Sequence, residues 1–592
     1  IRDRVVSNGA ALTSVTDRRT LLRPVNEIDA EVKQARASMK ALGNTETTLQ
    51  IRIEAARSAS MVVGDDNAVG HVPTEGEYNG EAGLRNALNN TTNGGGLTYI
   101  KNGSYTITDT VTIGDAVNGG SGWRIMGDPP ATTTGAPTGV YNMSTWVKMD
   151  GATAAKKIHL RNLNGIVIEG IGFEFSGAAN DWFFDVESCA DIVFKDCNFY
   201  NAVGVVKTTP MFSFRGDCTS IQFHNCSFTS VETAREIFHI YEVAGTNSMH
   251  DFRVKACQFL VQSTILNVGG SLGGLYPVGG LALDRFTGLW EGNRIATLPV
   301  AYDYTPFVGD FATVPVSAFT FKDNIIDLST NAAMSSFLKM ELLNPATTNN
   351  VLSVQISGNH VTGEVGTSGS IFKFSSYNAS SSCNNNTFSS FVAAMRSAIE
   401  YLHFGNRLNS TGVEIRDNFM DLFPTTGQTT GVLISSASGA VTTTPGSSGL
   451  YITGNVIQGG WAGVIIASNV ALGEGFIHNN SFKEVAACCI DVYNDTGGAT
   501  YGIRNLSISQ NASIGGGRRS YANANPGGSF PADMLVSRPC IVVQGPDGIL
   551  NLSVEDNQMS SWAGEADDVT WPDIQYPYQG ILLNIGTCEN IK

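Results

Sequence analysis

The sequence predicts an all-β chain folded as a right-handed parallel β-helix, and three observations lead to this prediction. An eight-residue pattern recurs along most of the chain, Asn or Cys stands at one fixed position of the pattern, and an apolar strand precedes the copies. The copies recur at intervals of 25 to 46 residues, and internal repeats with such intervals are typical of solenoids, in which each repeat forms one coil and packs on its neighbours.

The repeated pattern is apolar, any residue, apolar, two polar or small residues, Asn or Cys, any residue, apolar. The alternating apolar positions predict two strands with one buried face, joined by a tight bend at the polar residues. The clearest copies are IVFKDCNF at 192–199, IQFHNCSF at 221–228, FRVKACQF at 252–259, FTFKDNII at 319–326, VQISGNHV at 354–361, VEIRDNFM at 413–420, LYITGNVI at 450–457 and LSVEDNQM at 552–559.

The sixth position of the pattern predicts a ladder of side chains. Successive strands of a parallel sheet lie about 4.8 Å apart, so each Asn amide can hydrogen-bond its counterparts on the neighbouring coils. We also expect the Asn itself to adopt the left-handed conformation of the bend. Cysteines at this position are expected to be small buried residues rather than redox or metal groups. The column contains Cys197, Cys226, Cys257, Asn293, Asn324, Asn359, Asn386, Asn418, Asn455, Asn480, Asn511 and Asn557.

A third strand, nearly all apolar, completes each coil. It precedes the eight-residue pattern and is expected to be buried, because its residues are apolar on both sides of the strand. Examples are MFSF at 211–214, IFHIY at 237–241, FLKM at 337–340, VLIS at 432–435, VIIA at 464–467 and ILLN at 581–584.

A short helical stem is expected over residues 21–56, ahead of the coils. Apolar residues from Leu21 to Ile53 are spaced alternately by four and three residues, which is the heptad spacing of a coiled coil. Gly43, Asn44 and Glu46 interrupt the spacing, so two short helices are expected rather than one rod. We expect this coiled-coil stem to align a homotrimer; a helix packed on its own domain is the alternative.

The rest of the chain is divided around the stem and the coils. Residues 1–20 suit an attachment segment, and 57–78 suit a linker. Residues 79–165 are expected to hold a cap, with a helix at 81–90, and the first strands, because an uncapped β-helix exposes its strand edges. The parallel β-helix is expected over 166–592. It would be cut within a coil, because GTCENI at the end matches the lead-in ESCADI of an earlier coil.

Composition excludes several classes of protein. The chain has 37 Lys and Arg against 53 Asp and Glu, a net charge of −16, without a basic run, which argues against a nucleic-acid partner. No apolar stretch is long enough for a membrane helix. Ten cysteines among 592 residues are too few for a disulfide scaffold, and no metal-binding or phosphate-binding motif occurs. No metal and no cofactor are therefore expected.

The stem, the helix and strands at 81–107 and the Asn-marked coils together resemble bacteriophage tailspikes and tail fibres, within the pectate-lyase-like β-helix superfamily. The resemblance covers most of the chain. It implies a trimer attached through residues 1–56 to other tail or baseplate proteins of a virion, outside the cell. It also implies a β-helix that binds, and in many relatives cleaves, a polysaccharide of the bacterial surface. The sequence lacks the Asp-rich run that precedes the cap helix in many relatives.

Carboxylates at the end of the apolar strand are the candidate catalytic groups. A glycosidase needs two carboxylates, about 5–5.5 Å apart for retention or about 6.5–9.5 Å apart for inversion. Equivalent positions on adjacent or alternate coils give about 5 or 10 Å. The candidates are Glu242 and Asp284, expected on adjacent coils, and Glu341 and Glu400, expected two coils apart with Lys373 between them. Surface charges that limit edge association are the alternative interpretation.

Aromatic residues in long inserts between coils are the candidate sugar-binding groups, because sugar faces stack on exposed rings. Loops as long as the inserts at 298–316, 514–538 and 561–579 are uncommon within a domain, and those that occur often have a function. Packing of the loops over the β-helix is the alternative. The candidate substrate-binding residues are Tyr302, Tyr304, Arg518, Trp562 and Trp571.

These features predict a trimeric tail spike or fibre that recognises, and on one interpretation degrades, a host polysaccharide by hydrolysis or lyase chemistry. A lyase would pair a base with Arg215, Arg285 or Lys339. The first alternative is a structural or adhesive virion fibre without catalysis. The second is a secreted pectate-lyase-like enzyme. The stem disfavours it, because a monomeric enzyme needs no coiled coil to align three chains.

Overall fold

The computed structural model describes residues 61–64, 78–89, 96–108, 110–113, 120–128, 143–149, 158–175, 183–201, 210–230, 236–240, 247–268, 283–298, 304–311, 316–328, 334–341, 351–363, 365–366, 369–389, 395–403, 412–422, 429–436, 449–467, 470, 472–483, 485, 488–493, 502–516, 540–545, 548–561, 581–585 and 588–592. The predicted attachment segment and stem lie outside these residues. In the described part, no helix is long and apolar enough to cross a membrane.

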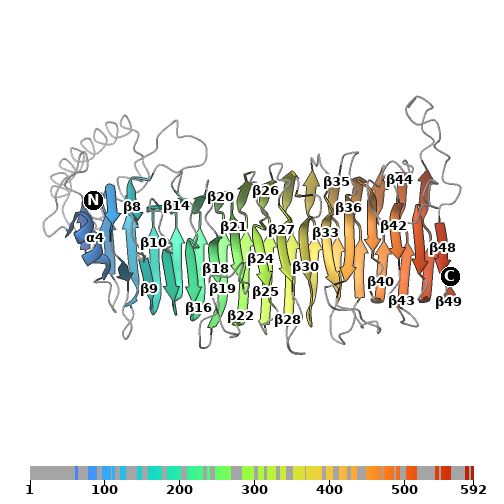
Figure 1. Cartoon of the computed structure of the whole chain (residues 1–592), viewed down its shortest axis with the longest axis horizontal. Coiled ribbons are helices and arrows are strands. Elements are labelled where there is room, and N and C mark those ends of the chain that lie inside the picture. Colours follow the sequence, from blue (N-terminus) through green and yellow to red (C-terminus); the bar gives the residue numbers. More distant parts are fainter. Residues whose placement is uncertain are drawn as a thin grey trace, which may run out of the picture.

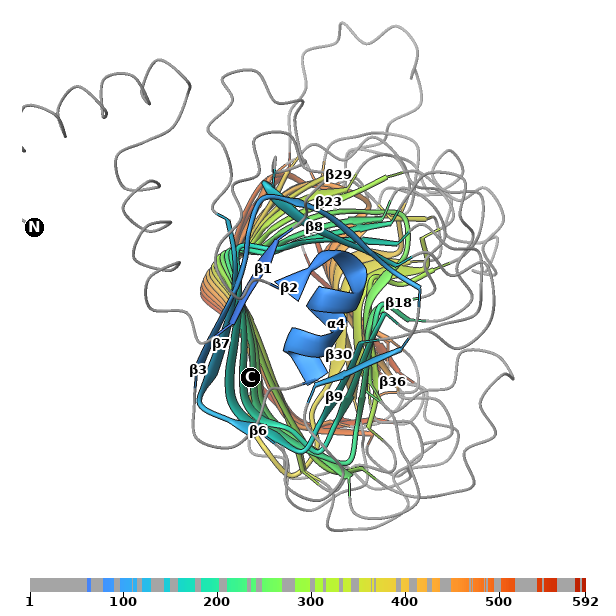
Figure 2. The ribbon, with the colours of Figure 1, turned by 90° about the vertical axis from the view of Figure 1, so that its left-hand side faces the viewer.

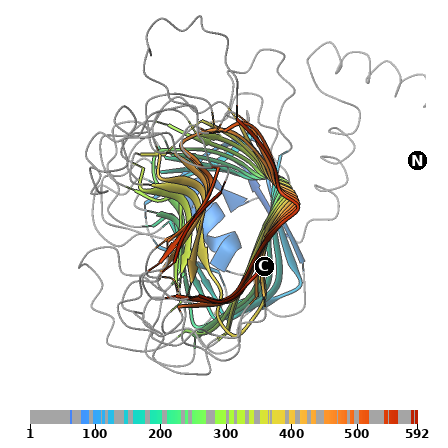
Figure 3. The ribbon, with the colours of Figure 1, turned by 90° about the vertical axis from the view of Figure 1, so that its right-hand side faces the viewer.

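The described chain forms three long parallel sheets, which we call A, B and C, wound into one elongated coil (Figure 1). The chain passes from A to B to C and returns to A one coil further on. Seen from the N-terminal end, this path runs clockwise as the coil recedes (Figure 2), so the β-helix is right-handed. The view from the other end shows the same three walls in register (Figure 3). The predicted parallel β-helix is thus confirmed.

Sheet A contains the strand that precedes each bend. Its strands are β1 (Met61–Gly64), β2 (Tyr78–Asn79), β3 (Gly96–Ile100), β6 (Gly120–Ser121), β7 (Trp123–Gly127), β10 (Leu163–Glu169), β13 (Ala190–Lys195), β16 (Asp217–His224), β19 (Asn247–Lys255), β22 (Leu283–Glu291), β25 (Val316–Lys322), β28 (Val351–Ser357), β31 (Ser381–Asn384), β34 (Val413–Arg416), β37 (Gly449–Thr453), β40 (Leu472–His478), β43 (Ile503–Ser509), β46 (Ile549–Glu555) and β49 (Cys588–Ile591). β1 and β2 lie within or at the edge of the stretch predicted as a linker.

Sheet B contains the strand that follows each bend. Its strands are β4 (Gly103–Ile107), β8 (Thr145–Met149), β11 (Gly172–Phe175), β14 (Asn198–Asn201), β17 (Ser227–Ser230), β20 (Gln258–Val261), β23 (Arg294–Thr297), β26 (Ile325–Leu328), β29 (His360–Gly363), β32 (Thr387–Ser389), β35 (Phe419–Leu422), β38 (Val456–Gly459), β41 (Ser481–Lys483), β44 (Ala512–Gly516) and β47 (Gln558–Ser561).

Sheet C contains the apolar strand. Its strands are β5 (Val111–Ile113), β9 (Ile158–Arg161), β12 (Phe184–Glu187), β15 (Phe212–Arg215), β18 (Glu236–Ile240), β21 (Thr264–Val268), β24 (Phe307–Asp310), β27 (Ser336–Glu341), β30 (Ser370–Ser375), β33 (Ser397–His403), β36 (Thr430–Ser436), β39 (Ala462–Ile466), β42 (Cys488–Tyr493), β45 (Ile541–Gly545) and β48 (Ile581–Ile585). The stacking in sheets A, B and C begins before residue 166.

One hydrophobic core runs through the inside of the coil. Inward residues of the same type stack on successive coils: the rings of Phe173, Phe199, Phe228 and Phe259 lie 5.3, 4.9 and 4.7 Å from one another in turn. Helix α4 (Gly80–Asn89) lies across the N-terminal opening (Figure 2), and its Leu84 is part of the core. The helix therefore covers apolar surface that an open coil would expose.

The Asn ladder is formed as predicted. The Oδ1 atom of Asn324 accepts hydrogen bonds from both the backbone N–H and the Nδ2 of Asn293, each at 2.9 Å, and the Nδ2 of Asn293 also donates to the carbonyl of Val254 at 3.0 Å. The same pair of bonds links each following Asn as far as Asn557. The ladder satisfies backbone groups that the bend removes from the sheet.

The conformation expected for the ladder Asn is wrong. The left-handed residue is the one before it: φ is 52° at Asp196, 56° at Asp323 and 55° at Asp417, and Gly292 and Gly358 occupy the same place with φ of 65° and 67°. Asp, Asn and Gly tolerate this conformation. The bend is thus made by the fifth residue of the pattern, which leaves the sixth free to direct its amide into the coil.

The cysteines of the ladder are buried and hydrogen-bond as Asn does. The Sγ atoms of Cys197, Cys226 and Cys257 donate to carbonyls of the preceding coil at 3.5, 3.5 and 3.6 Å. Burial raises the pKa of Cys197 and Cys226 well above that of a free thiol. Since the thiolate is the reactive form, we expect these thiols to resist iodoacetamide at pH 8 in the folded protein and to react fully in guanidinium, as read by peptide mass spectrometry. Alkylation in the folded state at the unfolded rate would contradict this burial.

Candidate functional site

A stripe of mostly polar and charged side chains runs along the outer face of sheet C. Most of its members lie between two core residues of their strand: Asp185 is between Phe184 and Val186. Alternate strand residues point to opposite faces, so these side chains point away from the core. The stripe, which we call the sheet C stripe, consists in register of His159, Asp185, Ser213, His239, Asn267, Val308, Lys339, Lys373 and Glu400.

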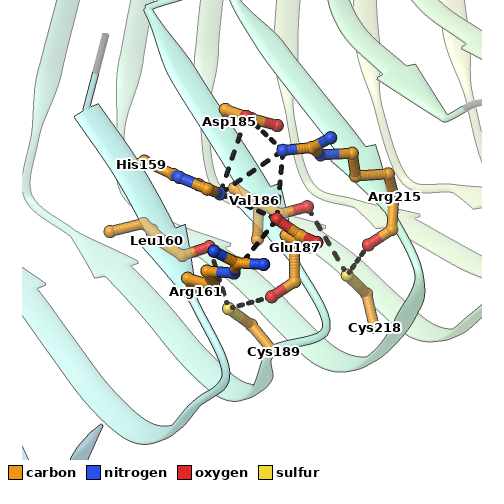
Figure 4. A network of polar contacts seen from close by, with 9 residues as sticks. All are labelled: His159, Leu160, Arg161, Asp185, Val186, Glu187, Cys189, Arg215 and Cys218. Carbon is orange, nitrogen blue, oxygen red and sulfur yellow. Dashed lines mark hydrogen bonds and ion pairs between the residues drawn. The ribbon is translucent and has the colours of Figure 1, made fainter. Parts of the chain in front are cut away.

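The first group of charges on this face, the Arg215 cluster, links β9, β12 and β15 (Figure 4). Nη2 of Arg215 lies 2.8 Å from Oδ2 of Asp185 and 3.0 Å from Oε2 of Glu187. Nε2 of His159 lies 3.0 Å from the same Glu187 oxygen and 3.6 Å from the Asp185 oxygen. Nε of Arg161 lies 3.5 Å from Glu187. Two carboxylates thus share one guanidinium and one imidazole.

Burial makes this cluster unlike an ordinary surface ion pair. The side chain of Asp185 is completely buried, whereas those of Glu187 and Arg215 are 25% and 23% exposed. A buried carboxylate is costly unless a cation and hydrogen bonds compensate for its lost hydration. Arg215 and His159 supply that compensation to Asp185, and Glu187 and Arg161 remain open to solvent and to a ligand.

A second group lies on the next coils of the same face. Glu236 is 1% exposed, and its Oε1 accepts a hydrogen bond of 3.1 Å from Nδ2 of Asn267. Nδ1 of His239 lies 3.6 Å from the other carboxylate oxygen. The stripe therefore continues as a buried carboxylate with polar neighbours.

The third group surrounds Glu400, which is 1% exposed. Its oxygens accept hydrogen bonds from the hydroxyls of Ser370 at 2.7 Å and Ser435 at 2.8 Å. Nη2 of Arg396 lies 3.2 Å away and Nζ of Lys373 lies 3.9 Å away. Both oxygens are engaged by donors, so the side chain of Glu400 is fixed in place.

Glu341 and Glu400 are on sheet C two coils apart, as predicted, but they are not at the same place on their strands. Lys373 pairs with Glu400 on one side and with Lys339 on the other, so Glu341 stands two residues further along. Two coils and two residues put the Cα atoms about 12 Å apart, rather than the 10 Å of aligned positions. Glu341 has its own cation, Lys339, at 2.5 Å. Glu341 and Glu400 therefore form separate ion pairs, with Lys339 and with Arg396 respectively, rather than one pair of facing carboxylates.

The other predicted pair does not occupy equivalent places. Asp284 belongs to β22 in sheet A, because the apolar strand of that coil is β21, which ends at Val268. Glu242 lies outside the described residues. The sequence prediction assigned Asp284 to the wrong strand because residues 269–282 separate the two strands and obscure where the first one ends.

The prediction for Tyr304 is also wrong. This ring is 7% exposed and is part of the hydrophobic core, and its backbone forms a parallel bridge with Met334. Its insert contains β24, a regular strand of sheet C, so Tyr304 and Phe307 pack inward instead of facing a sugar. Tyr302, Arg518, Trp562 and Trp571 lie outside the described residues.

Sequence reasoning missed the Arg215 cluster because it treated the third strand as apolar throughout. The signal was the alternation in FDVE at 184–187, where Asp and Glu are separated by single apolar residues. The same outward position then carries a polar residue on most neighbouring coils. No group of His, Cys, Asp and Glu that could hold a metal ion occurs within the described part of the chain.

Comparison with known proteins gives matches in structure alone. No protein-family model matches the chain, and no curated protein matches its sequence. The ORF18 protein of Geobacillus virus E2 is similar with a TM-score of 0.33 and 13% identity, over 58% of this chain and 60% of that one.

Two further solved structures are similar in the same range. The tailspike protein of E. coli bacteriophage HK620, in complex with a pentasaccharide, has a TM-score of 0.38 and 11% identity, over 72% of this chain and 77% of that one. PfbA, a surface adhesin of Streptococcus pneumoniae, has a TM-score of 0.36 and 10% identity, over 70% of this chain and 88% of that one. These values support no conclusion about the activity or ligand of this chain.

Proposed function

We propose that this chain is the β-helical part of a bacteriophage tail spike or tail fibre that binds a polysaccharide of the host surface along the sheet C stripe. The protein lies outside the cell on the virion, as a homotrimer joined through residues 1–56 to other tail proteins. The heptad spacing of the predicted stem and the regular coils support this assignment. The observation that carries the binding function is the sheet C stripe.

The stripe suits an extended ligand rich in hydroxyl groups. It repeats once per coil, about every 4.8 Å, so a long chain lying along the helix axis would pass one stripe position after another, of which His159, Lys339 and Lys373 are partly exposed. Buried members such as Asp185 and Glu400 hold their cations in fixed positions. The exposed member Lys339 and the neighbouring Arg396, whose side chains are 35% and 45% exposed, can bind the ligand.

The described carboxylates favour recognition over acid–base catalysis. A general acid must carry a proton near neutral pH and point at the leaving group. Glu400 accepts two hydroxyl hydrogen bonds and faces two cations, and Asp185 faces Arg215 and His159. Each carboxyl group is therefore already engaged by hydrogen-bond donors and cations of the protein itself. An adhesive fibre is the function that this geometry supports best, and a depolymerase is the alternative that the cleavage assay tests.

Purified full-length protein tested on a panel of bacterial lipopolysaccharides and capsular polysaccharides measures both functions. Binding is read by biolayer interferometry, and cleavage by reducing ends and by the absorbance of unsaturated products. We expect binding to one polysaccharide without release of fragments. Release of fragments would assign a depolymerase, with absorbance separating a lyase from a hydrolase. The absence of binding to the polysaccharide of a host that the virion infects would contradict the proposal.

Replacing Lys339 with Met should lower the affinity for that polysaccharide about tenfold, or 1.4 kcal/mol. Met keeps the aliphatic stem and removes the charge from the stripe. Lys322→Met is the matched control, because Lys322 is 36% exposed and also ion-paired, to Glu291 at 2.7 Å, but lies on sheet A. Equal losses in both variants would show that the effect comes from net charge and not from the stripe. Melting temperatures check that both variants remain folded.

A further inference from the structure

A separate surface on sheet A carries a pair of aromatic rings, of which Tyr451 is exposed and Phe476 is half-buried. Tyr451 of β37 and Phe476 of β40 are opposite each other in the register of adjacent strands. Each is next to core residues, Leu450 and Ile452 for Tyr451 and Ile477 for Phe476, so both rings point outward. Tyr451 is 38% exposed, and the ring centroids are 5.0 Å apart with an angle of 5° between the planes.

The stack has a defined orientation. Its centroid separation is close to the strand spacing of about 4.8 Å, so the rings are stacked along the helix axis and each turns one face to its partner. A Cβ atom at Gly449 would lie 2.7 Å from Cε2 and 2.9 Å from the hydroxyl of Tyr451. A glycine at position 449 therefore leaves the space that the Tyr451 ring occupies.

Beyond Phe476, the same column continues with short side chains. Ser507 of β43 is opposite Phe476, and Ser553 of β46 follows on the next coil. The second face of Phe476 is therefore turned toward two successive serines. These two coils extend about 10 Å along the axis, which is room for a sugar ring against the aromatic face.

Polar groups border the two serines on both sides. On one side Asn505, Asn551 and Asn590 form an exposed ladder, with Nδ2-to-Oδ1 hydrogen bonds of 2.8 Å between neighbours. On the other side His478 packs edge-on against Phe476, at 5.6 Å between ring centroids, and its Nε2 lies 3.0 Å from the Ser507 hydroxyl. Burial lowers the pKa of His478, although the contact with Ser507 acts in the opposite direction.

Most charges near the ring pair are paired within the surface. The carboxylate of Glu414, opposite Tyr451, is ion-paired to Arg416 on the same strand. Lys592 is paired to Glu555 at 3.1 Å. The carboxylate of Glu474, opposite Asn505, also lies on this face. The other donors and acceptors are amides, hydroxyls and an imidazole, which suit the hydroxyl and amide groups of an uncharged sugar. Aromatic faces with convergent polar groups are typical of sites for such ligands.

We propose that the outer face of sheet A around Phe476 is a second glycan-binding surface, which takes a neutral sugar unit on the Phe476 ring beside Ser507 and Ser553. We call it the Phe476 surface. It is separate from the sheet C stripe and does not depend on the function proposed for that stripe. Because the sugar unit is uncharged, its binding should be insensitive to salt, whereas binding through the lysines of the stripe should weaken as salt rises.

Full-length protein is titrated with the neutral oligosaccharides maltohexaose, cellohexaose, mannohexaose and chitohexaose up to 10 mM, and binding is followed by calorimetry and ligand-observed NMR. We expect one of them to bind at 50 mM and at 500 mM NaCl with equal affinity. Phe476→Ala should lower that affinity at least tenfold. Leu289→Ala, an outward aliphatic residue in the same column on β22, is the control and should leave it unchanged.

Two further variants separate binding from folding. Ser507→Phe continues the aromatic stack and occupies the place of the sugar, so it should abolish binding without loss of thermal stability. Gly449→Ala displaces the Tyr451 ring and should weaken binding less than Phe476→Ala does. Full binding by Ser507→Phe, or no binding of any of the four oligosaccharides by the unmodified chain, would overturn the proposal. It would also be overturned if Ser507→Phe changed the mass in light scattering, because the surface would then be an interface between copies of the chain.

Discussion

Replacing Asn418 with Leu is expected to destabilise the folded chain by about 3–5 kcal/mol. Oδ1 of Asn418 accepts hydrogen bonds from the backbone N–H and the Nδ2 of Asn386, at 3.0 and 2.9 Å, and its own Nδ2 donates to the carbonyl of Cys383 at 2.8 Å. Leu leaves that N–H and that carbonyl buried without partners, and each such group costs about 1–3 kcal/mol.

Guanidinium unfolding, followed by circular dichroism and by tryptophan fluorescence, measures this loss. The matched control is Asn505→Leu, because Asn505 also takes part in an amide ladder but is exposed, so that water replaces its lost hydrogen bonds. We expect the control to change stability by no more than about 0.5 kcal/mol. Equal losses at the two positions would show that the buried ladder does not hold the coils together.

Replacing Arg215 with Met is expected to have the second largest effect, a loss of about 3 kcal/mol. The variant leaves the completely buried Asp185 without its nearest cation, and breaking a buried pair from one side costs about 3–5 kcal/mol. The lower end applies because Arg215 is 23% exposed and His159 remains within 3.6 Å of Asp185. The same variant should weaken polysaccharide binding, because Asp185 and Glu187 lose the side chain that holds them in place.

A double variant tests whether the charge of Asp185 causes this loss. Arg215→Met combined with Asp185→Asn removes both charges of the pair, so it should be more stable than Arg215→Met alone, and the cycle measures their coupling. Arg416→Met on sheet A is the control: its ion pair with Glu414 is 47% and 43% exposed, and such pairs contribute about 0–1 kcal/mol. If Arg416→Met were as damaging as Arg215→Met, burial of Asp185 would not be the cause.

The fold could be predicted from the sequence because its rules are local. Every coil repeats one eight-residue pattern with an apolar strand before it, and each coil meets only its neighbours. The ladder from Asn293 to Asn557 follows from the stacking of equal positions. The same local logic failed at the bend, where the pattern does not say which of two adjacent polar residues takes the positive φ: it is Asp323, not Asn324.

The candidate site could be predicted only in part. Glu341 and Glu400 were placed on the correct sheet, but their alignment depends on where each strand begins, and the lengths of the intervening loops hide this from the sequence. Tyr304 was misassigned for a related reason, because the strand that follows it brings its ring into the core. The Arg215 cluster joins residues 159 to 215, whose contact exists only when three coils are in register.

What the sequence by itself determined about this protein is the coil: three strands per repeat, an apolar interior and an inward column of Asn and Cys, since these need only periodicity. What the tertiary structure alone decided is the chemistry of the outer faces. The register of the coils brings Asp185 to Arg215 and Tyr451 to Phe476 across about 25 to 30 residues. The physical reason is that contacts between outward side chains of different coils form only when the coils are stacked in register.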